Sequence, residues 1–321
     1  MLTQIGTNWR RGQRNLTNLP KTDSSESPRP NPITTVLRLM RVQHWAKNLF
    51  VLLPLPFALS MDQVPDLLVL SLGLFGFSLL SSAVYVFNDI HDRTRDQSHP
   101  IKRLRPLAAG LVDIRGAWLV AGGSLILGLG ILGFLPGAGV GGPKPWILAL
   151  LYLAGNGVYT LFARSVAWLD VVFLSGFFVL RLILGCSLVL LPLNGGLLAT
   201  GFSLAFALAL GKRFSELSSG VPSHYRSSLL QYQEDHLRRA MGISVVFCWI
   251  GYLWSCYSMP LFVPEKWWWS GIPAGVGLYL LLDEVLVRKS GREPVEILNG
   301  ARWSRYVISI WAILVFLSTR Y

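Results

Sequence analysis

Residues 66–96 read DLLVLSLGLFGFSLLSSAVYVFNDIHDRTRD. As far as residue 88 the stretch is an apolar block of about 20 residues, the length that crosses the hydrocarbon core of a bilayer. Such a block predicts a helix, because an open sheet cannot satisfy its backbone hydrogen bonds in lipid. The block runs directly into amide and acidic side chains. One stretch therefore predicts both a membrane-spanning helix and a candidate site at its end.

Similar blocks recur along the chain. The protein has 321 residues, of which 52% are hydrophobic and 14% charged, whereas a soluble domain has about a quarter charged residues. Charged, proline or glycine residues separate the blocks, which fall at 37–59, 66–88, 114–134, 145–163, 166–191, 195–218, 237–258, 267–287 and 303–319. The sequence therefore predicts an all-α polytopic membrane protein with about nine transmembrane helices.

The basic residues are distributed unevenly between the connections. Of the 29 Lys and Arg residues, only Lys144, Lys266 and Arg320 fall in connections assigned to the outside, and Arg181 lies within a block. Because Lys and Arg favour the cytoplasmic side, we expect a multi-pass protein of the inner (cell) membrane, with its N-terminus in the cytoplasm and its C-terminus outside. Residues 1–32 predict a disordered cytoplasmic tail, and residues 33–321 a single transmembrane domain. Topology alone explains a basic excess of this kind, and no nucleic-acid partner is expected.

Three polar side chains follow one another at helical spacing after the second block. Asn88, Asp92 and Asp96 stand at i, i+4 and i+8, which places them on one face of a helix. Carboxylates one turn apart repel each other unless a cation lies between them. Amide and carboxylate oxygens suit Mg²⁺, which usually pairs with substrate phosphates. The spacing predicts a Mg²⁺ site, and a solvated acidic helix end is the alternative.

Cations follow these acids immediately. Lys102, Arg103 and Arg105 lie within four positions of one another. Acids that hold a metal beside cations that cover phosphate oxygens are typical of a polyphosphate site. A juxtamembrane cluster that faces anionic lipid is the alternative, and it would need no aspartates.

Further polar side chains lie at the ends of other blocks. Tyr159, Arg164 and Asp170 precede or begin the fifth block, and Arg181 lies inside it. An ionisable group within a span is costly and indicates a functional site, although Arg181 could instead form a structural bridge with a neighbouring acid. The first block opens with Arg41, Gln43, Lys47 and Asn48, and the sixth closes with Lys212, Arg213 and Glu216. For the last group an exposed helix-end pair is as good an explanation as a ligand contact.

The motifs N-x-x-x-D-x-x-x-D after the second block and Y-x4-(K/R)-x5-D after the fourth resemble those of the UbiA superfamily of intramembrane prenyltransferases. The resemblance covers roughly residues 33–321. The stretches RVQHWAKN (41–48), NDIHDRTRDQSHPIKRLRPLAAG (88–110) and GKRFSEL (211–217) are most similar to the decaprenyl-phosphate phosphoribosyltransferase branch. The second motif has Arg164 where the superfamily more often has Lys, which keeps the charge but changes the geometry of its hydrogen bonds.

The resemblance implies a helical bundle with a cytoplasmic cavity and a lateral opening for a polyprenyl chain. It implies transfer of the 5-phosphoribosyl group from 5-phosphoribosyl 1-diphosphate to a polyprenyl phosphate, with release of diphosphate and with Mg²⁺ as cofactor. By the same resemblance, the metal ligands would be Asn88, Asp92, Asp96 and Asp170, and the three aspartates would be catalytic. The donor phosphates would contact Lys47, Asn48, Lys102, Arg103, Arg105, Tyr159 and Arg164. The acceptor phosphate would contact Arg41, Gln43, Arg181, Lys212 and Arg213.

Two other functions would use some of the same features. Prenyl transfer from a polyprenyl diphosphate to an aromatic or other small acceptor uses the same aspartates, but a single diphosphate needs fewer cations than a phosphoribosyl donor and a lipid phosphate together. The density of cations therefore favours phosphoribosyl transfer. A non-catalytic transporter or lipid-binding scaffold would use the basic connections without Mg²⁺, and aspartates at helical spacing argue against it.

Overall fold

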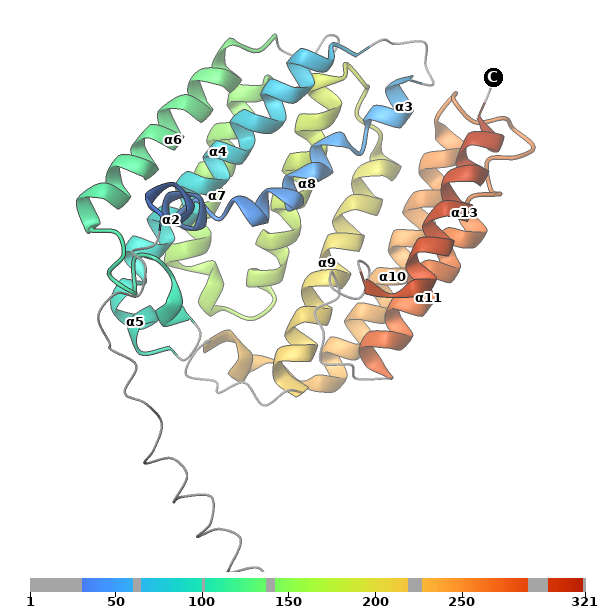
Figure 1. The fold of residues 1–321 in the computed structure, drawn as a ribbon. Helices are drawn as coiled ribbons and strands as arrows, with labels where there is room; N and C mark the ends of the chain where they lie inside the picture. Colours follow the sequence, from blue (N-terminus) through green and yellow to red (C-terminus); the bar gives the residue numbers. More distant parts are fainter. Residues whose placement is uncertain are drawn as a thin grey trace, which may run out of the picture.

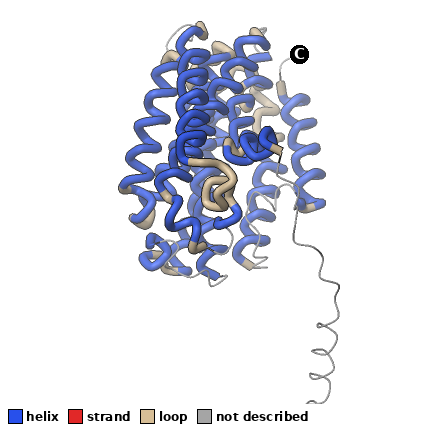
Figure 2. The backbone as a smooth tube through the Cα atoms, turned by 60° about the vertical axis from the view of Figure 1, so that its left-hand side comes forward, coloured by secondary structure: helices blue, strands red, loops and turns tan. Residues whose placement is uncertain are grey.

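A computed structural model describes residues 31–59, 65–99, 102–136, 142–218, 227–287 and 300–319. Within these ranges the regular structure is helical, and one antiparallel β-bridge joins Phe262 to Thr319. Figures 1 and 2 show the long helices running roughly side by side. The all-α prediction is confirmed. Of the predicted tail over residues 1–32, only Asn31 and Pro32 belong to the described residues, and they cap and begin the helix α2 (Pro32–Leu39).

Eight of the nine predicted blocks each correspond to one helix. These helices are α4 (Leu67–His91), α6 (Ile114–Phe134), α7 (Pro145–Leu161), α8 (Leu169–Leu188), α9 (Gly195–Ser218), α10 (Glu234–Ser258), α11 (Gly271–Leu286) and α13 (Arg302–Ser318). Five of them, α4, α6, α8, α9 and α10, are long and apolar enough to cross a membrane by length and composition. Asp66 and Asp113 define the starts of α4 and α6, because their carboxylates accept hydrogen bonds from the first free N–H groups.

The remaining block, 37–59, does not form a single helix. It contains the end of α2, the 3-10 helix η1 (Val42–Leu52) and the short helix α3 (Leu55–Leu59). Arg41 separates α2 from η1 with a left-handed backbone, at a φ of 53°. Pro54 separates η1 from α3 and has no N–H with which to continue a helical ladder. The prediction of one continuous helix here is wrong. It rests on hydropathy, which does not show where the backbone breaks.

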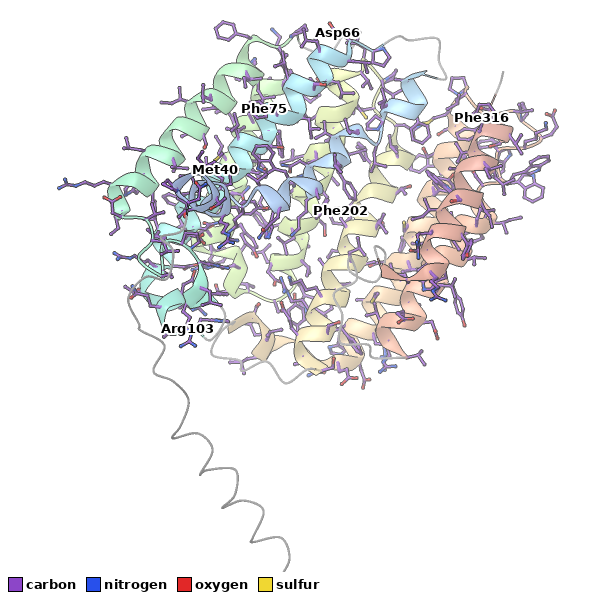
Figure 3. All side chains as sticks on the ribbon, viewed as in Figure 1. Met40, Asp66, Phe75, Arg103, Phe202 and Phe316 are labelled. Atoms are coloured by element: carbon purple, nitrogen blue, oxygen red, sulfur yellow. The ribbon has the colours of Figure 1, made fainter. Side chains whose placement is uncertain are left out.

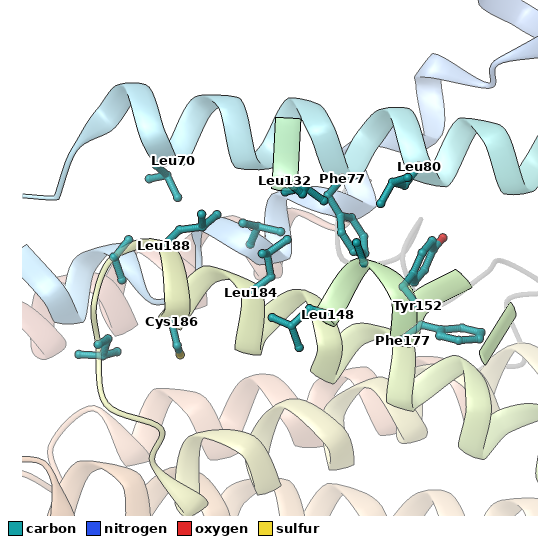
Figure 4. Close-up of a cluster of buried hydrophobic side chains, with 14 of the residues drawn as sticks. Leu70, Phe77, Leu80, Leu132, Leu148, Tyr152, Phe177, Leu184, Cys186 and Leu188 are labelled. Atoms are coloured by element: carbon teal, nitrogen blue, oxygen red, sulfur yellow. The ribbon is translucent and has the colours of Figure 1, made fainter. Parts of the chain in front are cut away.

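Two apolar cores meet at α8. The first includes Phe77, Tyr152 and Phe177 and lies between η1, α4, α7 and α8 (Figure 4). The second includes Leu210 and Phe214 and lies between α8, α9, α10 and α11. In Figure 1, α4 and α6 lie on one side of the molecule and α10, α11 and α13 on the other, with α9 between them. Helix α8 thus joins the two groups of helices.

The connections that carry most of the predicted site gather at one end of the bundle. In Figure 3 Arg103 lies at the lower edge and Asp66 at the opposite edge, and Figure 1 shows the helix α5 (Arg93–Gln97) at the same end as Arg103. The 3-10 helix η3 (Ala163–Ser165) joins this group through Arg164, which hydrogen-bonds Asp92. The connection after η3 contacts η5 (Ser227–Gln231), where the backbone N–H of Ala167 donates to Gln231 Oε1 over 3.0 Å.

The broken first segment packs against α8 through a glycine. A Cβ added to Gly185 would lie 2.1 Å from the backbone carbonyl oxygen of Val51 in η1. We therefore expect Gly185→Ala to lower the free energy of unfolding by about 1–3 kcal/mol, the usual cost of an overpacked interior. Gly176 lies on the same helix, and a Cβ there would meet nothing within 4 Å. Gly176→Ala should therefore be neutral or raise the stability by up to about 1 kcal/mol.

Unfolding of the two variants in detergent micelles, followed by tryptophan fluorescence, compares them directly. Equal stability of Gly185→Ala and Gly176→Ala would show that η1 does not press on α8 at this point.

Candidate functional site

The predicted acidic motif lies where α4 ends. Helix α4 stops at His91, Asp92 caps it, and α5 begins at Arg93. The one-turn spacing nevertheless survives the break, because the Asp92 N–H donates to the Asn88 carbonyl over 2.9 Å and the Asp96 N–H to the Asp92 carbonyl over 2.8 Å. Asn88, Asp92 and Asp96 therefore follow one another at single-turn intervals, as the spacing predicts.

A third acid, outside the i, i+4, i+8 series, belongs to this group. Asp89 is buried, and its carboxylate forms ion pairs with Arg41 and Arg105. The same Arg105 Nη1 lies 3.1 Å from Asp89 Oδ1 and 2.5 Å from Asp96 Oδ2. Asp89 stands seven residues before Asp96, a helical spacing that could have revealed the pair. Asp89 and Asp96 thus hold one cationic nitrogen between them.

The first and second motifs are joined directly. Arg164 donates from Nη1 to Asp92 Oδ2 over 2.8 Å and from Nη2 to Oδ1 over 3.0 Å, which is a bidentate pair. Thr160 Oγ1 also donates to Asn88 Oδ1 over 2.9 Å. Partial burial opposes ionisation of Asp92, but the hydrogen bond and charge of Arg164 outweigh it and lower the pKa of Asp92. Asp92 is therefore ionised at neutral pH.

Several of the predicted phosphate-binding cations converge on the same end of the bundle. The charges of Lys47, Arg41, Lys212 and Arg105 all act on His44 of η1. They come from η1 and its start, from α9 and from the connection after α5. Tertiary packing thus brings together cations that lie up to 171 positions apart in the sequence, from 41 to 212.

The other predicted phosphate-binding residues of this region differ in exposure. Lys102 is partly buried in the 3-10 helix η2 (Lys102–Leu104), and burial lowers its pKa. Arg103 is exposed at the edge of the molecule (Figure 3). Gln43 is exposed on η1, and Tyr159 is partly buried with its ring edge-on to Phe177. Of the two cations of η2, Lys102 is the more buried one, and the charge of Asp96 acts on it.

Asp170 lies in a different network. Its carboxylate is fully buried and accepts hydrogen bonds from Arg213 Nε over 2.9 Å, from the Tyr232 hydroxyl over 2.5 Å and from Ser228 Oγ over 3.4 Å. Arg213, 1% exposed, also donates to Glu216 over 2.7 Å. Burial and the hydrogen bond to Asp170 raise the pKa of Tyr232. Sequence spacing could not identify Tyr232 and Ser228, which are more than 50 positions away.

Arg181 lies farther along α8, eleven residues or about 16 Å from Asp170. It donates from Nε to Asn48 Oδ1 over 2.9 Å, and Asn48 donates onward to Ser78 Oγ over 3.0 Å. The rings of Phe77, Tyr152 and Phe178 surround its guanidinium at 5.2–5.4 Å. Among the described residues, no carboxylate forms an ion pair with it. The alternative of a structural bridge to an acid is therefore not seen in this part of the chain.

The residues at the end of α4 have the donor chemistry that Mg²⁺ needs. They offer amide and carboxylate oxygens, and Asp89 and Asp96 already stabilise a positive nitrogen between them. In this arrangement the oxygens of Asn88, Asp92 and Asp96 are engaged by Thr160, Arg164 and Arg105. Within the described ranges, no hydrogen bond or ion pair links Asp170 to them, and no three His, Cys, Asp or Glu side chains form a metal cluster.

The chain is similar in sequence to proteins of known name. The decaprenyl-phosphate phosphoribosyltransferase of Mycobacterium tuberculosis is 32% identical over 236 residues, which cover 70% of this chain and 76% of that protein. The nodulation protein NoeC of Azorhizobium caulinodans is 30% identical over 201 residues, which cover 60% of this chain and 62% of that protein.

A solved structure has the same fold. The UbiA homolog from Archaeoglobus fulgidus, bound to DMAPP and Mg²⁺, superposes with a TM-score of 0.68 at 16% identity and covers 88% of this chain and 99% of that chain. The model of the UbiA prenyltransferase family matches residues 48–304, most of the 321-residue chain. The chain is therefore a multi-pass membrane enzyme that belongs to the UbiA prenyltransferase family.

Proposed function

We propose that this enzyme transfers the 5-phosphoribosyl group from 5-phosphoribosyl 1-diphosphate to a polyprenyl phosphate of the decaprenyl type and releases diphosphate. The observation that carries the proposal is the convergence of Lys47, Arg41, Lys212 and Arg105 around His44, with Arg41 and Arg105 paired to the acids at the end of α4. The donor carries two phosphate-bearing groups and the lipid a third, so the substrates need many cations. The relatives named as decaprenyl-phosphate phosphoribosyltransferases support the same reaction.

In the proposed reaction the bond between the ribose C1 and the diphosphate oxygen breaks, and a lipid phosphate oxygen forms a new bond to C1 from the opposite face. Mg²⁺, held by Asn88, Asp92, Asp96 and Asp170, would neutralise charge on the departing diphosphate. The lipid phosphate is already anionic at neutral pH, so the reaction needs no general base. Positioning and charge stabilisation then provide most of the rate.

The remaining roles follow from position and charge. Lys47, Asn48, Lys102, Arg103, Arg105, Tyr159 and Arg164 are the proposed contacts of the donor phosphates, and Arg41, Gln43, Arg181, Lys212 and Arg213 those of the acceptor phosphate. Several of these residues already have partners. Arg41, Arg105 and Arg164 pair with acids at the end of α4, and two others are held inside the bundle. Arg213 is enclosed by Asp170 and Glu216, and Asn48 is buried against Arg181 and Ser78, so each reaches a phosphate only if its present partner releases it.

We further infer that residues 33–321 form the catalytic domain and that the acidic motifs lie on the cytoplasmic side of the cell membrane. The donor is a water-soluble, highly charged molecule, and the basic connections favour the cytoplasm. The second candidate reaction is prenyl transfer to a small aromatic acceptor. It is supported at the level of the family by the UbiA homolog bound to DMAPP and Mg²⁺.

One assay separates the two reactions. The purified protein is incubated with Mg²⁺ and polyprenyl phosphate, together with 5-phosphoribosyl 1-diphosphate that is radiolabelled in the ribose. We expect label in the organic phase and an equal amount of released diphosphate, both of which EDTA should suppress. In the parallel reaction, polyprenyl diphosphate is supplied with a labelled hydroxybenzoate. Label transfer only in the parallel reaction would replace the proposal with the second candidate, and transfer in neither would refute both.

A further inference from the structure

A cavity of about 220 Å³ lies between α4, α6 and α7. Small residues on its walls, Ala121, Gly122 and Gly157, leave this space, and a Cβ added to either glycine would meet nothing within 4 Å. Farther along α6, helices α4 and α6 are in close contact. A Cβ added to Gly128 of α6 would lie 2.8 Å from the carbonyl oxygen of Gly76 in α4. The cavity thus lies on the side of this contact where α6 begins.

The chemistry of the walls indicates a hydrocarbon occupant. Most of the lining side chains are apolar, and the polar ones largely bond to the protein itself: Thr160 donates to Asn88 over 2.9 Å, and Asn156 donates to the Tyr152 carbonyl over 2.7 Å. An apolar cavity of about 150 Å³ stays free of water but takes up a molecule of the size of benzene. A cavity of this size and lining, between membrane-spanning helices, favours part of a lipid chain over water.

The cavity reaches the lipid-facing surface. Phe87 of α4 and Trp118 of α6 line it and are both exposed, and their rings stand edge-to-face at 6.0 Å. Both helices are long and apolar enough to cross a membrane. A chain from the surrounding bilayer can therefore reach the cavity beside this aromatic pair without passing through the acidic site.

A cation stands at the membrane surface on the same face of α6. Arg115 is exposed in the first turn of α6, three residues before Trp118 and seven before Gly122, and these spacings share one helix face. Among the described residues it forms no ion pair. A Lys or Arg at this level attracts the phosphate of an anionic lipid. The charge of Arg115 thus complements the apolar cavity that lies two turns farther into the membrane.

We propose that this cavity binds one acyl chain of an anionic bilayer phospholipid, whose head-group phosphate lies against Arg115. The bound chain packs against Asn88 and Thr160, whose hydrogen bond joins the end of α4 to α7 beside the Asp92–Arg164 pair. A structural lipid here therefore supports the acidic motif from outside the site. The proposal does not depend on which substrates the enzyme uses.

Native mass spectrometry of the purified protein with phosphatidylglycerol or phosphatidylcholine tests this. The wild type should retain one phosphatidylglycerol in preference to phosphatidylcholine. Gly122→Leu fills the cavity and should weaken retention at least about tenfold. The matched control is Gly123→Leu, because Gly123 lies outside the cavity and a Cβ there also meets nothing within 4 Å. Arg115→Gln should reduce the preference for phosphatidylglycerol by about fivefold.

Thermal unfolding of the two leucine variants checks that both are folded. Equal retention in Gly122→Leu and Gly123→Leu, or no retained phospholipid in the wild type, would overturn the proposal. Displacement of phosphatidylglycerol by an equal concentration of polyprenyl phosphate would also overturn it, since the chain in the cavity would then belong to a substrate.

Discussion

Replacing Asp96 by Asn abolishes turnover in the proposed reaction while the protein stays folded, and Asp92→Asn does the same. Both changes remove a negative oxygen from the proposed metal site and keep the size of the side chain. In the proposed reaction the metal ligands and the neighbouring arginines would stabilise the charge of the departing diphosphate, and losing one such group typically costs about a hundredfold or more in rate. We expect at least that loss in kcat for each variant.

The ion pairs predict that folding survives both changes. Asp96→Asn leaves Arg105 paired with Asp89 at 3.1 Å. Asp92→Asn leaves the Arg164 side chain 28% exposed, so water can solvate its charge. The Asp92–Arg164 pair is partly exposed on both sides, and such pairs contribute about 0–1 kcal/mol. Asp96 is buried, but an Asn there keeps an amide oxygen that can accept from Arg105. The unfolding midpoint of each variant should therefore stay close to that of the wild type.

The measurement is turnover with labelled donor and polyprenyl phosphate, next to unfolding of the same preparations. Glu234→Gln is the control, because Glu234 forms an exposed ion pair with Arg238 on α10, 3.3 Å apart. It should retain full activity. Near-normal activity of both Asp92→Asn and Asp96→Asn would remove the first motif from the metal site.

The eight helices that were predicted correctly share a property that the sequence displays directly. Each is an apolar block closed at both ends by charge, proline or glycine, and for α6 and α9 the predicted bounds of 114–134 and 195–218 coincide with the helices. The block at 37–59 is equally apolar in part, yet its conformation depends on contacts with other elements. Asn48 turns inward to Arg181 and Ser78, and η1 meets α8 at Gly185. Local hydropathy contains none of this information.

The candidate site divides in the same way. The one-turn spacing of Asn88, Asp92 and Asp96 could be read from the sequence because hydrogen bonds along a helix set it. The partner of each acid could not be read from the sequence, because the packing of other segments brings Arg41, Arg105 and Arg164 to the acids. Asp170 is an example of the same limit, since its hydroxyl partners come from η5 and the residues next to it.

Asp170 therefore has two roles to separate, one in folding and one in the proposed metal site. Its carboxylate is fully buried and pairs with Arg213, which is 1% exposed. Removing one partner of a buried pair costs about 3–5 kcal/mol when the other charge is left uncompensated. Arg213 keeps its pair with Glu216, so the expected cost lies at the lower limit, about 3 kcal/mol. We expect Asp170→Ala to lower the free energy of unfolding by that amount and to lose activity. Glu234→Ala breaks an exposed pair and should change stability by less than about 1 kcal/mol.

The double variant Asp170→Ala/Arg213→Met separates the roles, because it removes both buried charges and leaves Glu216 partly exposed to water. We expect it to recover about 2 kcal/mol of the stability lost in Asp170→Ala, since the buried charge of Arg213, which has lost its buried partner, is gone. Turnover should stay absent, because the proposed metal ligand has not returned. Unfolding of the protein by added denaturing detergent measures stability, and the transfer assay on the same samples measures turnover. Recovery of activity together with stability would show that Asp170 holds Arg213 in place and takes no part in binding the metal.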